Sequence, residues 1–139
     1  MAYLIRLFGH SSNPVAHHAC EELLAAVMEA DPLIHEVGDR RGGVGWISFE
    51  LAASRPSRST ASTRVEVNTR PDVLALCLQS DEAEVVSGDL AGSNVMVGLT
   101  LSGETDWQSV SAIWRATRDL WATVAWDEGS GFGASMDDL

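Results

Sequence analysis

The chain contains no lysine, two cysteines and no long apolar run. Its best apolar run, Val73 to Leu78, is far shorter than the roughly 20 residues needed to cross a bilayer, so we expect no membrane segment. The first residues lack the long apolar core of a secretory signal peptide. Two cysteines are too few for a disulfide framework, which indicates a cytoplasmic protein with reduced thiols.

Basic residues are scarce as well, since nine arginines stand against 20 acidic residues, for a net charge of −11. The imbalance is uneven: residues 71–139 carry a net −10, whereas residues 54–70 carry +3. A strongly negative chain is a poor ligand for nucleic acid or for anionic membranes. Acidity of this kind is common among bacterial cytoplasmic proteins, where it favours solubility.

A length of 139 residues and a hydrophobic content of 45% suit one globular domain. We expect this domain to cover residues 1–134 and to be followed by a frayed acidic tail over residues 135–139. Predicted strands outnumber predicted helices, and several strands follow one another as hairpins. The expected class is therefore α+β, with a mostly antiparallel sheet and two main helices packed on one face.

Short apolar or alternating segments predict six strands, which are Tyr3–Phe8, Leu33–Val37, Val44–Ala53, Thr63–Asn68, Ser93–Leu101 and Val124–Trp126. Residues 38–43 are predicted to form a turn because they are rich in glycine and charge. Residues 54–63 are polar and contain proline, which is typical of a loop. Residues 73–78 fit a short helix and a buried strand equally well.

Two helices are predicted from periodicity and from capping residues. Residues 14–30 carry apolar side chains at three- and four-residue steps, with Asn13 as the expected N-cap and Asp31-Pro32 at the end. The second helix should begin after Thr105, which stands three residues before Gln108 in a capping-box pattern.

Three tryptophans, Trp107, Trp114 and Trp121, recur at seven-residue steps along the second helix. Such spacing places them on one side of a helix, with a drift of only about 20° per step. We expect all three to pack against the sheet as core. The alternative is that one of them anchors a partner or a second copy of the chain, because tryptophan is frequent in interface hot spots.

Candidate metal ligands crowd into one short segment that contains His10, His17, His18 and Cys20. Zinc accepts such ligands, but the paired spacings of known zinc motifs are missing. Cys20 falls on the apolar stripe of the first helix, where a small buried residue is expected rather than a nucleophile. We therefore expect no metal, no cofactor and no thiol chemistry.

Two basic segments are weak candidates for anion binding. The glycine-rich segment 40–45 matches no phosphate-binding motif and fits a hairpin turn better. Arg55, Arg58, Arg64 and Arg70 form a basic strip without interleaved aromatic residues, so nucleic-acid binding is not expected. No catalytic fingerprint is present, which argues against an enzyme.

These features favour a non-catalytic acidic binding protein. In general type it resembles immunity or inhibitor proteins, which neutralise a basic partner such as a toxin by charge complementarity. One alternative is a small-ligand-binding or enzymatic domain, with its pocket between the sheet and the tryptophan-rich helix. A second alternative is an assembly subunit of a larger complex, and a homodimer also stays open.

The predicted partner surface combines acidic residues from two turns with one apolar anchor. Acidic side chains would steer a basic cleft, and a tryptophan beside them would supply apolar contact. These residues are Asp81, Glu82, Glu84, Asp89, Trp126, Asp127 and Glu128.

Replacing Asp81, Glu82 and Glu84 by serine should slow association with a basic partner several-fold at low salt, because such charges act mainly on the association rate. The stability of the fold should change little, since exposed charges contribute little to it. Stopped-flow mixing over a salt series would measure the effect. Association rates that are independent of salt in both proteins would contradict it.

Overall fold

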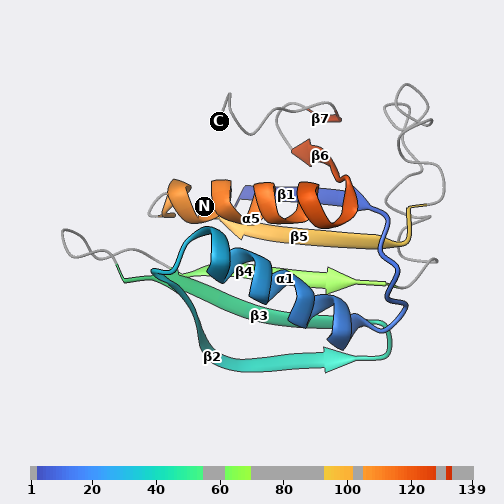
Figure 1. The fold of residues 1–139 in the computed structure, drawn as a ribbon, viewed down its shortest axis with the longest axis horizontal. Helices are drawn as coiled ribbons and strands as arrows, with labels where there is room; N and C mark the ends of the chain where they lie inside the picture. Colours follow the sequence, from blue (N-terminus) through green and yellow to red (C-terminus); the bar gives the residue numbers. More distant parts are fainter. Residues whose placement is uncertain (1–2, 55–61, 70–92, 102–104, 128–130, 133–139) are drawn as a thin grey trace.

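Seven strands form one antiparallel sheet in the order β2-β3-β4-β5-β1-β6-β7 (Figure 1). The computed structural model describes residues 3–54, 62–69, 93–101, 105–127 and 131–132. Its strands are β1 (Tyr3–Gly9), β2 (Ile34–Gly43), β3 (Trp46–Ala53), β4 (Thr63–Asn68), β5 (Val95–Leu101), β6 (Val124–Asp127) and β7 (Gly131–Phe132). Strand β1 lies inside the sheet, between β5 and β6.

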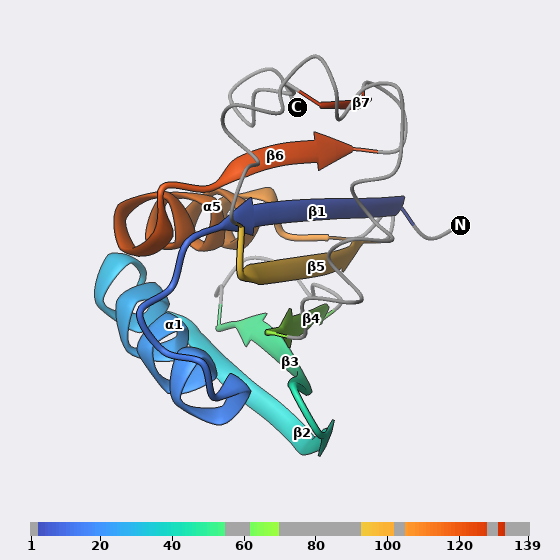
Figure 2. The same ribbon diagram turned by 90° about the vertical axis from the view of Figure 1, so that its right-hand side faces the viewer.

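Both described helices, α1 (Ala16–Ala30) and α5 (Trp107–Trp121), cover the same face of this sheet (Figure 2). They also pack against each other. The prediction of an α+β fold with a mostly antiparallel sheet and two helices on one face is therefore confirmed. No helix within the described ranges is both long and apolar enough to cross a membrane.

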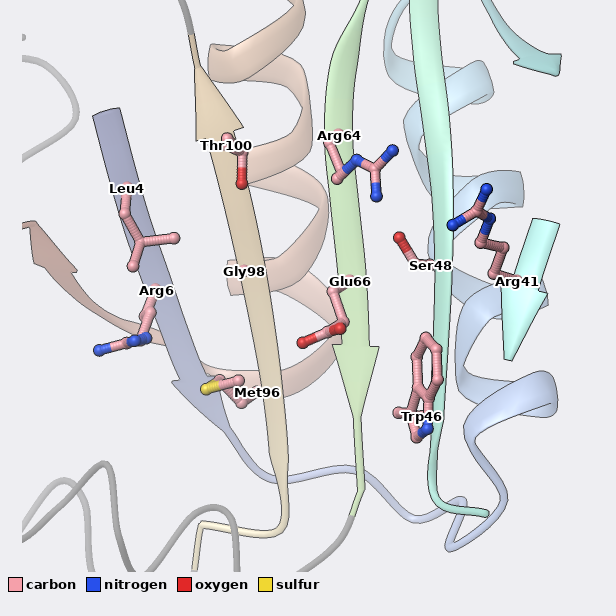
Figure 3. A pocket seen from close by; sticks show the side chains of 10 residues that line it. All are labelled: Leu4, Arg6, Arg41, Trp46, Ser48, Arg64, Glu66, Met96, Gly98 and Thr100. Atoms are coloured by element: carbon pink, nitrogen blue, oxygen red, sulfur yellow. The ribbon is translucent and has the colours of Figure 1, made fainter. Parts of the chain in front are cut away.

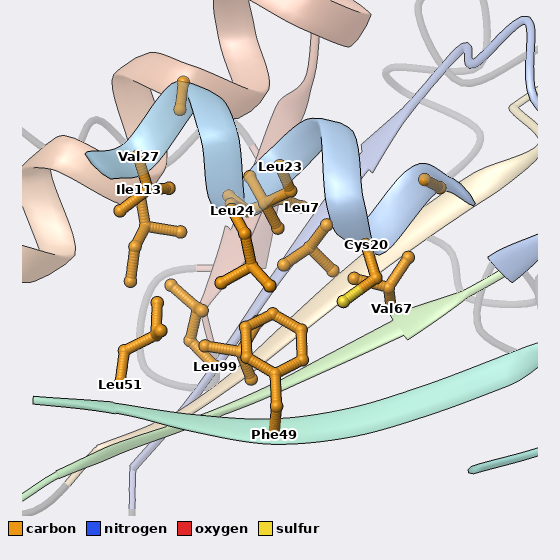
Figure 4. Packing of buried hydrophobic residues seen from close by; sticks show 14 of the residues in the cluster. Leu7, Cys20, Leu23, Leu24, Val27, Phe49, Leu51, Val67, Leu99 and Ile113 are labelled. Carbon is orange, nitrogen blue, oxygen red and sulfur yellow. The ribbon is translucent and has the colours of Figure 1, made fainter. Parts of the chain in front are cut away.

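The core lies between the helices and the inward side chains of six neighbouring strands, β1 to β6 (Figure 4). Alternation along each strand sends every second residue inward. Leu7, Leu99 and Phe49 represent β1, β5 and β3 in this layer, and all three are buried. The helices contribute Leu23 and Ile113, both fully buried. The period-two pattern thus separates a packed face from a face turned away from the helices.

The hairpin between β2 and β3 differs from the prediction. Residues 38–43 do not form a turn but continue β2, and the two-residue turn is Val44-Gly45, with Gly45 at a φ of 78°. Gly38 has a φ of 70°, and the pairing of β2 with β3 shifts in register between Val37 and Arg41. The glycine and charge content of this segment therefore marks an irregular strand, in which Gly38 supplies the positive φ.

The predicted helix caps were wrong by one or two residues. The N-cap of α1 is Val15, and Asn13 instead donates a side-chain hydrogen bond to Glu22. The N-cap of α5 is Asp106, whose carboxylate accepts a hydrogen bond from the Ser109 hydroxyl. Polar residues just before a helix compete for several local partners, so composition alone does not determine which residue caps it.

The three tryptophans do not share one environment, contrary to the expectation that all are core. Trp121 is 3% exposed, Trp114 is half-buried against the core, and Trp107 is 46% exposed. The Arg118 guanidinium carbon lies 5.9 Å from the centre of the Trp114 ring, in cation–π geometry. Ser109 and Val110 of the same turn are buried, so the first turn of α5 is covered. Trp107 is exposed because the seven-residue stripe drifts around the helix by about 20° per step, away from the buried side.

The remaining elements follow the predictions closely where they can be compared. Strand β4 has the predicted bounds, and β1 and β6 each extend one residue further. Helix α1 ends at Ala30, directly before Asp31-Pro32. Most of the predicted 54–63 loop, residues 73–78 and the tail at 135–139 lie outside the described residues.

Leu23→Ala should lower the free energy of unfolding by about 2–5 kcal/mol, because it leaves a cavity between α1 and the sheet. Leu33→Ala is the matched control: Leu33 is 43% exposed, and its truncation should cost less than about 0.5 kcal/mol. Urea unfolding of the two variants measures the difference. Equal losses would contradict the described packing.

Candidate functional site

The face of the sheet opposite the helices, called the open face below, carries a hollow of about 450 Å³ (Figure 3). Its lining comes from five strands, β1 to β5, and combines charged, aromatic and apolar side chains. Within the described residues, both helices lie on the other face, so no described helix fills this hollow. The size is that of a small binding pocket, and the hollow is half-open to the surroundings.

The strand register explains why these side chains meet. Residues paired across antiparallel strands point to the same face. One continuous row of pairs crosses the open face, and it runs Arg41, Ser48, Glu66, Gly98 and Arg6. The four strand spacings from Arg41 to Arg6 amount to about 19 Å. Residues that are far apart in the sequence thus form one row across the sheet.

Arginine dominates the charge of this hollow: Arg6, Arg41 and Arg64 line it, against a single acidic residue, Glu66. Arg64 also pairs with Glu50, with 3.3 Å between the guanidinium Nη2 and the carboxylate Oε1. Within the described part of the chain, Arg41 has no acidic group at ion-pair distance. A protein of net charge −11 therefore presents a locally basic surface here.

Arg40 and Arg41 are neighbours in β2 with opposite roles. Arg40 points to the helix side, where its Nε and Nη2 donate to the two carboxylate oxygens of Glu36 at 2.7 and 2.8 Å. It also forms an ion pair with Glu21 of α1, and this hydrogen bond lowers the pKa of the Glu21 carboxyl. Arg41 pairs in register with Ser48 and so faces the open side. The strand thus separates a structural arginine from one available to a partner.

Trp46 forms one wall of the hollow and is half-buried. Its indole lies against Gly43, where a Cβ would come within 2.5 Å of the indole Nε1. The same tryptophan also borders a second hollow of about 450 Å³, between the start of α1 and the β2–β3 turn. Val15 lines this second hollow and is 48% exposed. Val44 lies in the β2–β3 turn and is 84% exposed. Trp46 therefore lies between the basic hollow and a second hollow beside the start of α1.

The chemistry of the open face is that of anion binding. Guanidinium groups stay charged throughout the physiological pH range, so they recognise carboxylates or phosphates but do not exchange protons. Ser48 and Glu66 add a hydroxyl group and a hydrogen-bond acceptor between the arginines. Apolar contact is available from the half-buried Leu4 and Trp46 at the margins.

The predicted metal-ligand segment does not converge on one point. His17 and His18 are exposed on α1, with ring centres 6.1 Å apart, whereas Cys20 is fully buried in the core. His10 is exposed directly after β1. Among the described residues, no group of three histidine, cysteine or acidic side chains is placed to hold a metal ion.

The predicted partner surface lies mostly beyond the described residues. Asp81, Glu82, Glu84, Asp89 and Glu128 fall in undescribed segments. The backbones of Trp126 and Asp127 belong to β6 and pair with Arg6 and Ile5 of β1. That surface therefore stays a prediction. Of the predicted basic strip, Arg64 is described, and it lies exposed on β4 beside the hollow.

The pocket expected between the sheet and the tryptophan-rich helix is not the hollow that the structure shows. Val110 and Ile113 of α5 are buried in the core on the helix side. The hollow of the open face lies on the other side of the sheet. One missed part of the site carried a signal in the sequence: polar and apolar side chains alternate over residues 64–67, which marks a polar face on β4, whereas Arg6 stands alone among apolar residues in β1.

Three comparisons with known proteins were made. No family model, no curated protein and no solved structure matches the chain.

Cys20 should keep its proton in the folded protein, because burial raises the pKa of its thiol to about 11. In the unfolded chain a thiol ionises near pH 8.5. The stabilising effect of the buried neutral thiol is therefore complete below about pH 8.5, and it is lost as the pH rises toward about 11. Urea unfolding of wild type and Cys20→Ala over this range should show a steeper decline in the wild type. Parallel curves would contradict it.

Proposed function

We propose that the protein is a non-catalytic binding protein, of the inhibitor or immunity type, that engages a partner protein through its open face. The observation that carries this proposal is the basic hollow bounded by Arg41, Arg64 and Trp46. Arginine and tryptophan are the residues most enriched in interface hot spots, and here they share one exposed face.

The composition of the surface favours a protein partner over other ligands. The row of side chains crosses about 19 Å of sheet, a width suited to a macromolecular surface rather than to an enclosed small molecule. Half-buried Leu4 and Trp46 add apolar area to this face. A polyanion such as nucleic acid would be repelled by the net charge of −11, because long-range electrostatics follows the whole molecule.

A second candidate is the neutralisation of a basic partner through the acidic residues of segment 71–139. The net charge of −10 in that segment favours it. The two candidates use different surfaces and respond to opposite charge changes, so variants can separate them. If the open face binds the partner, the loss of arginine weakens binding. If the acidic segment 71–139 binds it, the loss of acidic residues weakens binding.

Arg41→Gln should reduce partner recovery several-fold when the tagged full-length chain is used to capture proteins from a lysate of its source cells. Arg40→Gln is the matched control, because it makes the same change one residue away on the opposite face of β2. Quantitative mass spectrometry of the captured proteins measures both. The protein specifically lost with Arg41→Gln is then purified, and its activity is assayed with and without the chain.

Inhibition of that partner by wild type, and much weaker inhibition by Arg41→Gln, would support the proposal. Equal recovery with both variants would exclude the open face as the binding surface. Turnover of the partner by the chain would exclude the non-catalytic part of the proposal.

A further inference from the structure

Gly98 occupies the centre of the open face without a structural reason for being glycine. Its φ is not positive, and no described atom lies within 4 Å of a Cβ built on it. Other strand glycines have such reasons: a Cβ on Gly9 would come within 2.7 Å of the Trp121 carbonyl, one on Gly43 would strike Trp46, and Gly38 has a positive φ.

The rest of β5 consists of good strand formers, Val, Met, Leu and Thr. A glycine in a strand interior weakens the strand, and it often marks a place where a ligand or another backbone approaches closely. Gly98 lies between Glu66 of β4 and Arg6 of β1 in register, so the missing side chain leaves a notch in the central row. The notch forms part of the hollow.

Beside the notch, Arg41 and Arg64 reach toward each other from β2 and β4, across β3 and near Ser48 (Figure 3). Two guanidinium groups converging in this way favour an anion between them. Glu50 engages one donor atom of Arg64, and a guanidinium offers five N–H donors, so donors remain for a ligand. Glu66 faces the notch as an acceptor.

We propose that the open face binds an extended segment of a partner protein, whose aspartate or glutamate carboxylate lies between Arg41 and Arg64 and whose backbone crosses the notch above Gly98. This deepens the proposed function and rests on it. A carboxylate is favoured over a phosphate chain because the local positive charge is small and the whole chain is strongly negative. Glu66 accepts a hydrogen bond from a backbone N–H of the segment, a contact that a phosphate group cannot supply.

The test titrates the isotope-labelled full chain with acetyl-(Ser-Glu)₃-amide and follows it by NMR. Saturable shifts are expected at the Gly98 amide, the Trp46 indole N–H and the Arg41 Nε–H. The neutral peptide acetyl-(Ser-Gln)₃-amide should shift none of them. Arg41→Gln should weaken binding by about ten-fold or more, as expected when a charge-assisted hydrogen bond is lost, whereas Arg40→Gln should leave binding unchanged.

Gly98→Ala and Gly98→Val should block binding in a graded way, because they fill the notch. Both should keep or raise the free energy of unfolding, since a strand former replaces glycine in open space. Loss of stability in Gly98→Val would mean that the chain itself occupies the notch, which overturns the proposal. Binding that survives Gly98→Val overturns it as well.

Two further arms separate the ligand sources. Tighter binding of the oligonucleotide dT₆ or of inorganic phosphate at the same residues would replace the carboxylate by a phosphate ligand and overturn the proposal. Absence of shifts with the glutamate peptide would overturn it while leaving the capture experiment intact, because a partner could then bind the open face through other contacts. Failure of the capture experiment alone, with the peptide bound as described, would overturn the proposed function instead.

Discussion

Packing of one face of the sheet under α1 and α5 is the constraint on which the rest of the structure depends. The apolar side chains of six strands are buried against the helices, and burial of such area is the main favourable term in folding. Because strand residues alternate between faces, the same packing directs every intervening side chain outward. The open face therefore consists of residues that lie two positions apart along each strand. Arg6, Arg41 and Arg64 lie on this face, on the side of the sheet opposite the core.

The irregularity in β2 extends this constraint to the edge of the sheet. The register shift between Val37 and Arg41 sets which of two adjacent arginines faces the helices. Arg40 then ties β2 to α1 through Glu36 and Glu21, and Arg41 joins the open face. A one-residue slip would exchange these roles: Arg40 would turn to the open face and lose its ion pairs with Glu36 and Glu21, and Arg41 would turn toward α1. The positive φ of Gly38 is the local feature that accompanies this register shift.

Much of the fold could be predicted from local pattern, whereas the site could not. Strand β4 and helix α1 carry strong periodicity, and their extents follow from it. The β2–β3 turn was misplaced because glycine and charge are common to turns and to irregular strands, and the two differ only in pairing. The exposure of Trp107 depends on which side of α5 faces the core, because Ser109 and Val110 of the same turn are buried. The basic row needs the strand order, since Arg6, Arg41 and Gly98 are distant in sequence and meet only when β1 inserts beside β5.

The central position of β1 also has a consequence for synthesis of the chain. This strand leaves the ribosome first, yet both of its hydrogen-bonding partners, β5 and β6, come from residues 95–127. The hairpins β2–β3 and β3–β4 can pair while translation continues, but β1 keeps two unpaired edges until the last third of the chain is made. Non-local pairing of this kind slows folding, and an unpaired apolar strand is a template for aggregation. Strand β1 is therefore exposed to wrong pairing until β5 and β6, the strands that flank it, have been made.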